Sequence, residues 1–450
     1  MRNWKKATAA VASVAALGML MAGCGNPAAT TSGSDDTDTS AADYWPAEDT
    51  KLDGVKLTFW AAQNSNKIPL KVIEDFEKAT GAEIDLQTIP DNYESNVQTK
   101  ITTGDAPDVM FWQAVPSTLA GFVAQNKLQK LDDAPWLDKY ADGIADAGGK
   151  ATDGSYYGAL VSAPDTEGVW YNKKVFEKAG ITETPKNWDE FKAAAQKIKD
   201  TKAAESPLFE MAGSQWGTQW AVNVQLAEAA QDGLWDNVNA NKDSFEGDDI
   251  LGAIKEYKSL FDDGFYNKDA GSAKDVDQAQ ALIDGKTGMI IQTNSMFASI
   301  AALADNDKAK LDETIGFFPI SKEGNVATSI PQQGNCIVAF KSGDEKREAA
   351  ARQFISFWLG SDYENFIKDQ NLVSIIKGVD TPDTVPQASL DAFEALSNAV
   401  GSMQSQAIAN PDLYLNLANM VNGTMTPEDV AKTTQDQFAQ IAKAQGAEGF

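Results

Sequence analysis

The 450-residue chain contains no histidine and only two cysteines, Cys24 and Cys336. Without histidine it can form neither a Ser-His-Asp triad nor a metal site with imidazole ligands. Two cysteines are too few for a four-thiolate zinc site. The 65 acidic residues remain as potential acids and bases, but most of the usual catalytic groups are missing. The sequence therefore favours a protein that is not an enzyme and that carries no cofactor and no metal ion.

Positive charge is also scarce, because 38 basic residues stand against 65 acidic ones and the formal net charge is −27. Such a surface repels a phosphate backbone, so we exclude nucleic acid as a partner. The hydrophobic fraction of 43% and the charged fraction of 23% are typical of a soluble globular protein. A chain of this length predicts two or three domains.

The first residues carry the pattern of a bacterial export signal. Arg2, Lys5 and Lys6 precede an uncharged stretch, residues 7–22, which is too short for a membrane span but typical of a signal peptide. The stretch ends in Met-Ala-Gly-Cys24 and resembles the lipobox of lipoproteins, although leucine is usual where methionine stands here.

This pattern predicts a lipoprotein signal peptide at 1–23, with lipid (palmitate) attached to Cys24. Residues 24–50 are mostly small and polar and predict a flexible linker. The chain would then sit at the extracellular face of the cell membrane, anchored by lipid. Cys336 is predicted to be a buried thiol.

Alternating and helical patterns succeed one another after the linker. Residues 55–60 alternate with period two, and residues 84–89 do so again. Between them apolar residues recur at helical spacing up to Gly81. A second helical pattern stops at Gly104, and a short buried strand follows at 109–111. This strand–helix–strand–helix–strand order predicts a parallel α/β sheet.

Three later helices are also marked in the sequence. Asn187 is a candidate N-cap with Glu190 three residues on, which is the spacing of a capping box. Residues 345–366 predict one long helix. Thr426 followed by proline predicts the start of the last helix.

Four segments of the chain, taken together, resemble one family. They are similar to turns and helix starts of the extracellular solute-binding proteins of ATP-driven sugar importers, the group that includes maltose-binding protein. The segments are Thr103–Val109 (TGDAPDV), Trp170–Lys173 (WYNK) followed by Phe176, Thr184–Phe191 (TPKNWDEF, with asparagine where threonine is usual) and Asp284–Met289 (DGKTGM). The resemblance covers about residues 51–450.

The resemblance implies a two-lobed α/β fold of the periplasmic-binding-protein type, with three hinge crossings and the ligand in the interlobe cleft. The first lobe would hold 51–163 and 335–373, and the second 164–334 and 374–450. The implied partners are a carbohydrate and the permease subunits of an ABC transporter in the membrane. The chain itself would act as a monomer.

A sugar is recognised by planar polar groups at its hydroxyls and by aromatic rings against its faces. In α/β sheets, ligands bind beyond the carboxyl ends of the strands. Polar and aromatic residues at predicted strand ends, at the crossings and in a glycine-rich stretch are therefore our ligand-binding candidates: Gln63, Asn64, Trp112, Gln113, Asp165, Glu167, Trp216, Trp220, Asn294, Ser295, Gln332, Gln333 and Gly334.

Each of these candidates also has a structural interpretation. Trp216 and Trp220 are four residues apart, a helical spacing that is equally typical of a core. The amides and Ser295 are suited to capping turns, and Asp165 and Glu167 to solvating the hinge. We interpret Trp170 and Trp188 as core residues.

Three other functions stay open at this point: an enzyme, the binding of another class of ligand, and a sensory role. The Ser-x-x-Lys pattern at Ser374 and the Lys-Thr-Gly pattern at Lys286 are typical of penicillin-recognising enzymes, but their chain order is reversed and Ser-Asp-Asn is absent. A carboxylate-based extracellular glycosidase is the remaining enzymatic alternative. The same fold could instead bind a polyamine, a peptide or a metal chelate, and a sensory role is not separable from transport.

Overall fold

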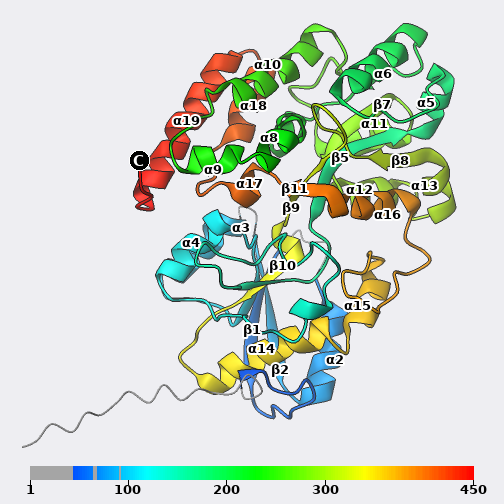
Figure 1. Cartoon of the computed structure of the whole chain (residues 1–450). Coiled ribbons are helices and arrows are strands. Elements are labelled where there is room, and N and C mark those ends of the chain that lie inside the picture. The colour runs from blue at the N-terminus through cyan, green and yellow to red at the C-terminus, as the bar shows by residue number, and fades with distance from the viewer. Residues whose placement is uncertain (1–43, 64–67, 91–92) are drawn as a thin grey trace, which may run out of the picture. The chain divides into compact units, whose positions relative to one another are not determined.

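The structure is a computed structural model and describes residues 44–63, 68–90 and 93–450 (Figure 1). The predicted signal peptide, Cys24, most of the predicted linker and Asn64 lie outside these ranges. Within the described ranges, no helix is both long enough and apolar enough to cross a membrane.

The first lobe is built on a five-stranded sheet with the order β2-β1-β3-β10-β4. β1 pairs in parallel with both β2 and β3, and helices α2 and α3 connect them, so the predicted parallel start of the fold is confirmed. β10 comes from much later in the chain and runs antiparallel to β3 and β4. The elements are β1 (Lys56–Ala62), α2 (Leu70–Thr80), β2 (Glu83–Ile89), α3 (Tyr93–Thr102), β3 (Val109–Phe111), α4 (Pro116–Ala124), η1 (Leu137–Lys139), β4 (Gly158–Leu160) and β10 (Cys336–Ala339). Cys336 is fully buried in β10, as predicted.

Aromatic side chains join this sheet to α14 (Glu345–Leu359). The ring of Phe59 lies 5.3 Å from that of Phe111 and 6.0 Å from that of Phe354. Trp358 completes the group at 6.0 Å from Phe111. Rings at these distances stabilise the contact beyond the area that they bury, so α14 is fixed on the sheet.

The prediction of one long helix over 345–366 is wrong. α14 ends at Leu359, and a separate helix, α15 (Tyr363–Gln370), follows. Gly360 has φ −108° and ψ −108°, and a Cβ there would lie 2.0 Å from the carboxylate of Glu48. The break therefore comes from a tertiary contact with the start of the described chain, which periodicity does not reveal.

The described end of the predicted linker is not flexible but packed on the first lobe. Trp45 makes an edge contact with Trp136 at 5.0 Å, and Arg352 donates to the carbonyl oxygen of Tyr44 at 2.8 Å. Gln353 donates to the carbonyl of Thr50 at 2.8 Å. Residues 44–50 thus belong to the lobe, because two side chains of α14 bind their backbone.

The second lobe is built on a six-stranded sheet around β5 (Asp165–Asn172). β5 runs antiparallel to β7 on one side and to β8 and β9 on the other. Trp170 and Trp188 are buried in this lobe, as predicted. The other strands are β6 (Ser206–Leu208), β7 (Thr287–Thr293), β8 (Ile315–Phe318), β9 (Ala327–Ile330) and β11 (Ala399–Gly401).

Many helices surround this second sheet (Figure 1). The predicted caps are confirmed: the side chain of Asn187 accepts from the backbone N–H of Glu190 at 2.9 Å, and that of Thr426 accepts from the N–H of Asp429 at 3.1 Å. The helices are α5 (Lys173–Ala179), α6 (Trp188–Thr201), η2 (Trp216–Gln219), α7 (Trp220–Asn223), η3 (Val224–Leu226), α8 (Ala227–Gln231), α9 (Leu234–Asn239), α10 (Asp248–Asp262), α11 (Asp275–Ile283), α12 (Ser295–Leu303), α13 (Lys308–Thr314), α16 (Gln387–Glu394), η5 (Ala395–Asn398), α17 (Met403–Gln406), α18 (Leu413–Val421) and α19 (Pro427–Ala444).

Three connections link the lobes. The first joins β4 to β5 through 161–164, and the second joins β9 to β10 through η4 (Gln333–Asn335). The third differs from its expected position at 373–374. Ile375 and Ile376 are buried in the core of the first lobe, and the carbonyl of Ile375 accepts from the N–H of Ala141. The third connection therefore follows these two residues and ends before α16.

Candidate functional site

Glu167 is the centre of a buried polar network in the second lobe. β5 carries it, and its side chain is fully buried. One carboxylate oxygen accepts from the hydroxyl of Thr328 in β9 at 2.7 Å, and the other accepts from the amide of Asn223 in α7 at 3.5 Å. Burial raises the pKa of Glu167 to about 7, while hydrogen bonds from Thr328, Ser402 and Asn223 act in the opposite direction.

Side-chain amides extend this network from Glu167 to the glycine-rich stretch. The amide of Asn223 also donates to the side-chain oxygen of Gln404 at 3.3 Å. Gln404 in turn donates to Gln219, and Gln219 donates to the carbonyl oxygen of Trp216 at 2.9 Å. A fixed chain of hydrogen bonds therefore links the carboxylate to the backbone that carries Trp216.

The two candidate tryptophans occupy different environments. Trp220 is buried, with 3% of its surface exposed, and belongs to the core. Trp216 is half-buried, and the two ring centroids lie 6.3 Å apart at 65°. Gln215, just before Trp216, has φ +63° and ψ −58°, a conformation that costs on the order of 1–3 kcal/mol. The fold thus holds the backbone at Trp216 in a strained position.

Tyr414 is an aromatic residue that sequence reasoning missed. It lies half-buried in α18, and its carbonyl oxygen accepts from the hydroxyl of Thr218 at 2.8 Å, next to Trp216. Burial raises the pKa of Tyr414, and the charges of Asp412 and Glu94 raise it further. Glu94 belongs to α3 of the first lobe, so Tyr414 lies within electrostatic range of that lobe. Its position far along the chain gives no local signal of this.

A second cluster of polar side chains lies where β7 ends, next to the second connection. The hydroxyls of Thr293 and Ser295 lie 2.6 Å apart. The amide of Gln332 lies 3.5 Å from the first and 3.4 Å from the second. The structure therefore brings Ser295 and Gln332 together, although 37 positions separate them.

Two buried acceptors near the second connection are incompletely satisfied. One oxygen of Asp165 accepts from the amide of Asn335 at 3.2 Å, but the other has no hydrogen-bond partner among the described residues. The side-chain oxygen of Gln333, beside Gly334 in η4, also lacks a partner within the described part of the chain. Buried acceptors of this kind call for a water molecule or a ligand hydroxyl.

The candidate ligand-binding residues of the first lobe are placed less favourably for contact with a ligand. Trp112 is 1% exposed, its ring lies 5.2 Å from that of Phe122, and its indole N–H donates to the carbonyl of Thr118 at 3.3 Å. Gln113 beside it is half-buried. Gln63 is exposed at the end of β1. Trp112 thus lies in the core of its lobe, and Asn64 lies outside the described residues.

The arrangement suits hydrogen bonding to a polar ligand. Hydroxyls, amides and two carboxylates surround the start of β5 and the second connection, with Trp216 and Tyr414 beyond them. Across 44–63, 68–90 and 93–450, no group of three or more His, Cys, Asp or Glu side chains is placed to hold a metal ion.

Sequence comparison identifies the family. The profile of the bacterial extracellular solute-binding proteins matches residues 71–393. The chain belongs to this family. It is 28% identical over 256 residues to a putative binding protein of Brucella abortus (strain 2308), which covers 54% of this chain and 57% of that relative. The match thus spans little more than half of the relative's length.

A second relative and two solved structures extend the comparison. The putative ABC transporter periplasmic-binding protein YcjN of Escherichia coli (strain K12) is 23% identical over 327 residues, covering 67% of each chain. The structure of RafE in complex with raffinose superposes with a TM-score of 0.69, at 19% identity over 86% of this chain and 99% of that one. The apo form of RafE from Streptococcus pneumoniae gives a TM-score of 0.68. These solute-binding structures share the two-lobed fold.

Proposed function

We propose that this solute-binding protein captures a neutral sugar or oligosaccharide between its lobes and delivers it to the permease of an ABC transporter. The observation that carries the proposal is the hydrogen-bonded chain from Glu167 to the half-exposed Trp216. It fixes the backbone that carries the partly exposed ring of Trp216, and a polyol needs an aromatic face of this kind. The raffinose complex of RafE and the name of the Escherichia coli relative support the sugar and the transporter, respectively.

In this proposal the protein acts by hinge closure. The three connections allow the lobes to open and close, and a sugar that contacts both lobes stabilises the closed form. The half-satisfied acceptors of Asp165 and Gln333 would accept sugar hydroxyls, with Ser295, Gln332 and Tyr414 around them. Gln63, Asn64 and Gln113 would contribute from the first lobe. An affinity on the order of micromolar corresponds to about −8 kcal/mol.

A thermal-shift panel tests the ligand class, because a ligand that binds only the folded state raises the melting temperature. The panel contains raffinose, maltotriose, chitin oligosaccharides, glucose and spermidine. We expect a shift with at least one sugar and none with spermidine, and calorimetry then gives the affinity. A shift with spermidine alone would establish the polyamine alternative. Release of shorter sugars during incubation would establish the glycosidase.

We also propose that residues 1–23 form a lipoprotein signal and that Cys24 anchors the protein to the outer face of the membrane. Expressed in a bacterial host, the full-length protein is expected in the membrane fraction and Cys24→Ser in the soluble fraction. Cys336→Ser is the matched control, because it alters the other cysteine and should leave the anchoring unchanged. Identical fractionation of wild type and Cys24→Ser would contradict the proposal.

A further inference from the structure

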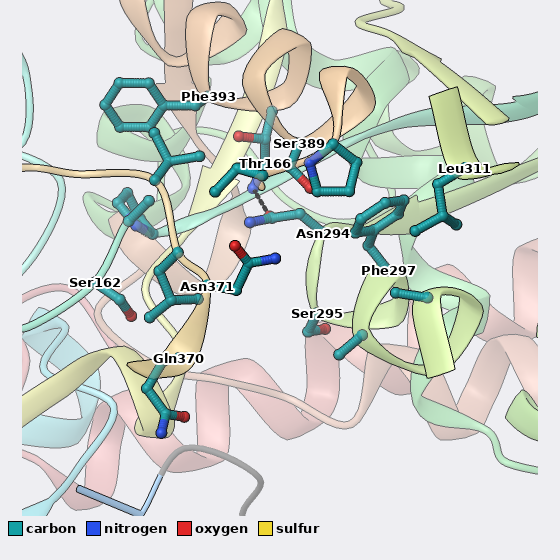
Figure 2. Close-up of a pocket in the computed structure, with 18 of the residues that line it drawn as sticks. Ser162, Thr166, Asn294, Ser295, Phe297, Leu311, Gln370, Asn371, Ser389 and Phe393 are labelled. Carbon is teal, nitrogen blue, oxygen red and sulfur yellow. Dashed lines mark hydrogen bonds between the residues drawn. The ribbon is translucent and has the colours of Figure 1, made fainter. Parts of the chain in front are cut away.

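A cavity of about 230 Å³ lies beside the connections between the lobes (Figure 2). Residues of the first connection form one wall, and residues 370–373 and 385–386 on either side of the third connection form another. α12 and α16 supply most of the rest, with single residues from β5, α13 and η5. We call it the hinge cavity. Glu167, Trp216 and Tyr414 do not line it. Ser295 is the one residue that both the hinge cavity and the polar group at the end of β7 include.

The lining of the hinge cavity is uncharged. Charged residues make up 23% of the chain, yet none of the described residues around this cavity is charged. Aliphatic and aromatic side chains cover most of it, and serine, threonine, asparagine and glutamine supply its polar groups. The lining residues are Ser162, Ala163, Pro164, Thr166, Asn294, Ser295, Phe297, Ala298, Ala301, Asn306, Leu311, Gln370, Asn371, Leu372, Val373, Val385, Pro386, Ser389, Phe393 and Leu396.

One polar group beneath the wall has no partner in the described structure, and a rotation of its side chain would turn it toward a ligand in the cavity. The hydroxyl of Ser162 belongs to a residue that is 3% exposed, and it has no hydrogen-bond partner in the described structure. By contrast, the side-chain oxygen of Asn294 already accepts from the backbone N–H of Thr166 at 2.5 Å (Figure 2). A buried hydroxyl without a partner is costly, so an occupant that hydrogen-bonds to Ser162 would remove that cost.

Size and chemistry together define the occupant. An apolar cavity of about 150 Å³ is large enough for benzene, so the hinge cavity accepts one substituted ring. The uncharged wall disfavours ions, since an unpaired charge there would lose its hydration. We propose that the hinge cavity is a second binding site, for a neutral single-ring molecule with a hydroxyl group, and that its occupancy biases the opening and closing of the lobes.

The bias follows from where the cavity lies. Its walls come from both lobes and from segments next to two of the three connections, so its shape depends on the angle between the lobes. A ligand that binds the cavity better at one angle between the lobes shifts the equilibrium toward that angle. The cavity ligand and the proposed sugar must then change each other's affinity by the same factor. This second step rests on the proposed sugar binding, whereas binding in the cavity does not.

Benzyl alcohol is the probe for the cavity, and neighbouring alanines of α12 supply a matched pair of variants. Ala301 lines the cavity, whereas Ala302 is exposed and does not. We expect benzyl alcohol to bind the wild-type protein and Ala302→Phe with a Kd on the order of millimolar, by ligand-observed NMR. Ala301→Phe should weaken this binding at least tenfold. Equal binding to both variants, or no binding to the wild type, would overturn the proposal.

Ser162→Ala provides a second measurement that does not depend on filling the cavity. It should weaken the binding of benzyl alcohol several-fold. The binding of toluene, which has no hydroxyl, should stay unchanged. If both probes lose affinity equally, the assigned role of the Ser162 hydroxyl is wrong.

The coupling is tested by measuring the Kd of the sugar found in the panel with and without saturating benzyl alcohol. We expect a change of at least threefold in the wild type and in Ala302→Phe, and none in Ala301→Phe. An unchanged Kd in all three would refute the coupling. If no sugar binds at all, the proposed function fails, while the benzyl alcohol titrations still decide whether the cavity is a site.

Discussion

The two lobes hold their candidate ligand-binding residues in different ways. In the second lobe, Glu167 and three amide side chains form a connected buried network that ends at the half-exposed Trp216. In the first lobe, Trp112 is packed away in the core and Gln63 lies exposed. One half of the proposed site would therefore be fixed before a ligand arrives, while the other half would be completed by contacts that the described state does not make.

This difference has an energetic meaning. A fixed array loses little conformational freedom when a ligand binds, so its contacts contribute more to affinity. The second lobe, whose buried network fixes the position of Trp216, should therefore carry most of the binding free energy of the proposed sugar. The first lobe should contribute chiefly to closure.

The largest expected effect is on stability and distinguishes the two tryptophans. Trp112→Ala should lower the free energy of unfolding by about 3–5 kcal/mol, because it leaves a cavity in the core. Trp216→Ala should lower it less, because that side chain is only partly buried. Urea unfolding followed by circular dichroism measures both. Equal losses would show that Trp216 is as much a core residue as Trp112.

The next effect concerns the charge of Glu167. Its pKa is about 7 in the folded protein and 4.5 ordinarily, so the folded state holds the proton more tightly. Stability from this group is greatest below pH 4.5 and is lost as the pH rises toward 7, by on the order of 3 kcal/mol. Glu167→Gln cannot titrate and should lack this loss.

The measurement is the difference in unfolding free energy between wild type and Glu167→Gln at several pH values. Taking the difference cancels the pH-dependent contributions of other buried carboxyl groups. Glu210 is one of these, because burial raises its pKa too. A difference that does not vary between pH 4.5 and 7 would mean that Glu167 is not isolated from water.

A smaller effect is expected on ligand affinity. Trp216→Ala should weaken the binding of the sugar identified in the panel about tenfold, since an aromatic contact contributes roughly 0.5–1.5 kcal/mol beyond its buried area. Trp216→Phe should restore most of the affinity, because it keeps an aromatic face. Calorimetry gives both values. An unchanged Kd in Trp216→Ala would exclude this ring from the site.

The smallest effect is expected in the first lobe. Gln63→Ala should change the Kd of the same sugar by less than threefold, because an exposed side chain loses more freedom on ordering than a fixed one. A loss larger than that of Trp216→Ala would reverse the comparison between the lobes.

The sequence predicted those features of the fold that depend on residues close together in the chain. Asn187 and Thr426 cap their helices through bonds to residues three positions on, and such spacing is visible in any sequence. The parallel start of the first sheet follows from its alternating pattern. The break at Gly360, by contrast, depends on Glu48, more than 300 residues earlier.

The site was less predictable for the same reason. A residue at a strand end was expected to face the ligand, but Trp112 turns into the core because Phe122 and Thr118 of α4 lie there to receive it. Ser295, proposed from a strand end, and Gln332, proposed from its place just before a hinge crossing, do meet. Tyr414 and the amides of Gln219, Asn223 and Gln404 had no local signal, because tertiary packing alone brings them together.

The clasp that α14 places on Tyr44 and Thr50 has a mechanical consequence. Any pull transmitted along the N-terminal segment is taken up by the first lobe before it reaches a connection. If that segment is anchored as proposed, the first lobe would be held in place and the second lobe would move. A docking partner would then sense the angle between the lobes through the motion of the half that carries Trp216.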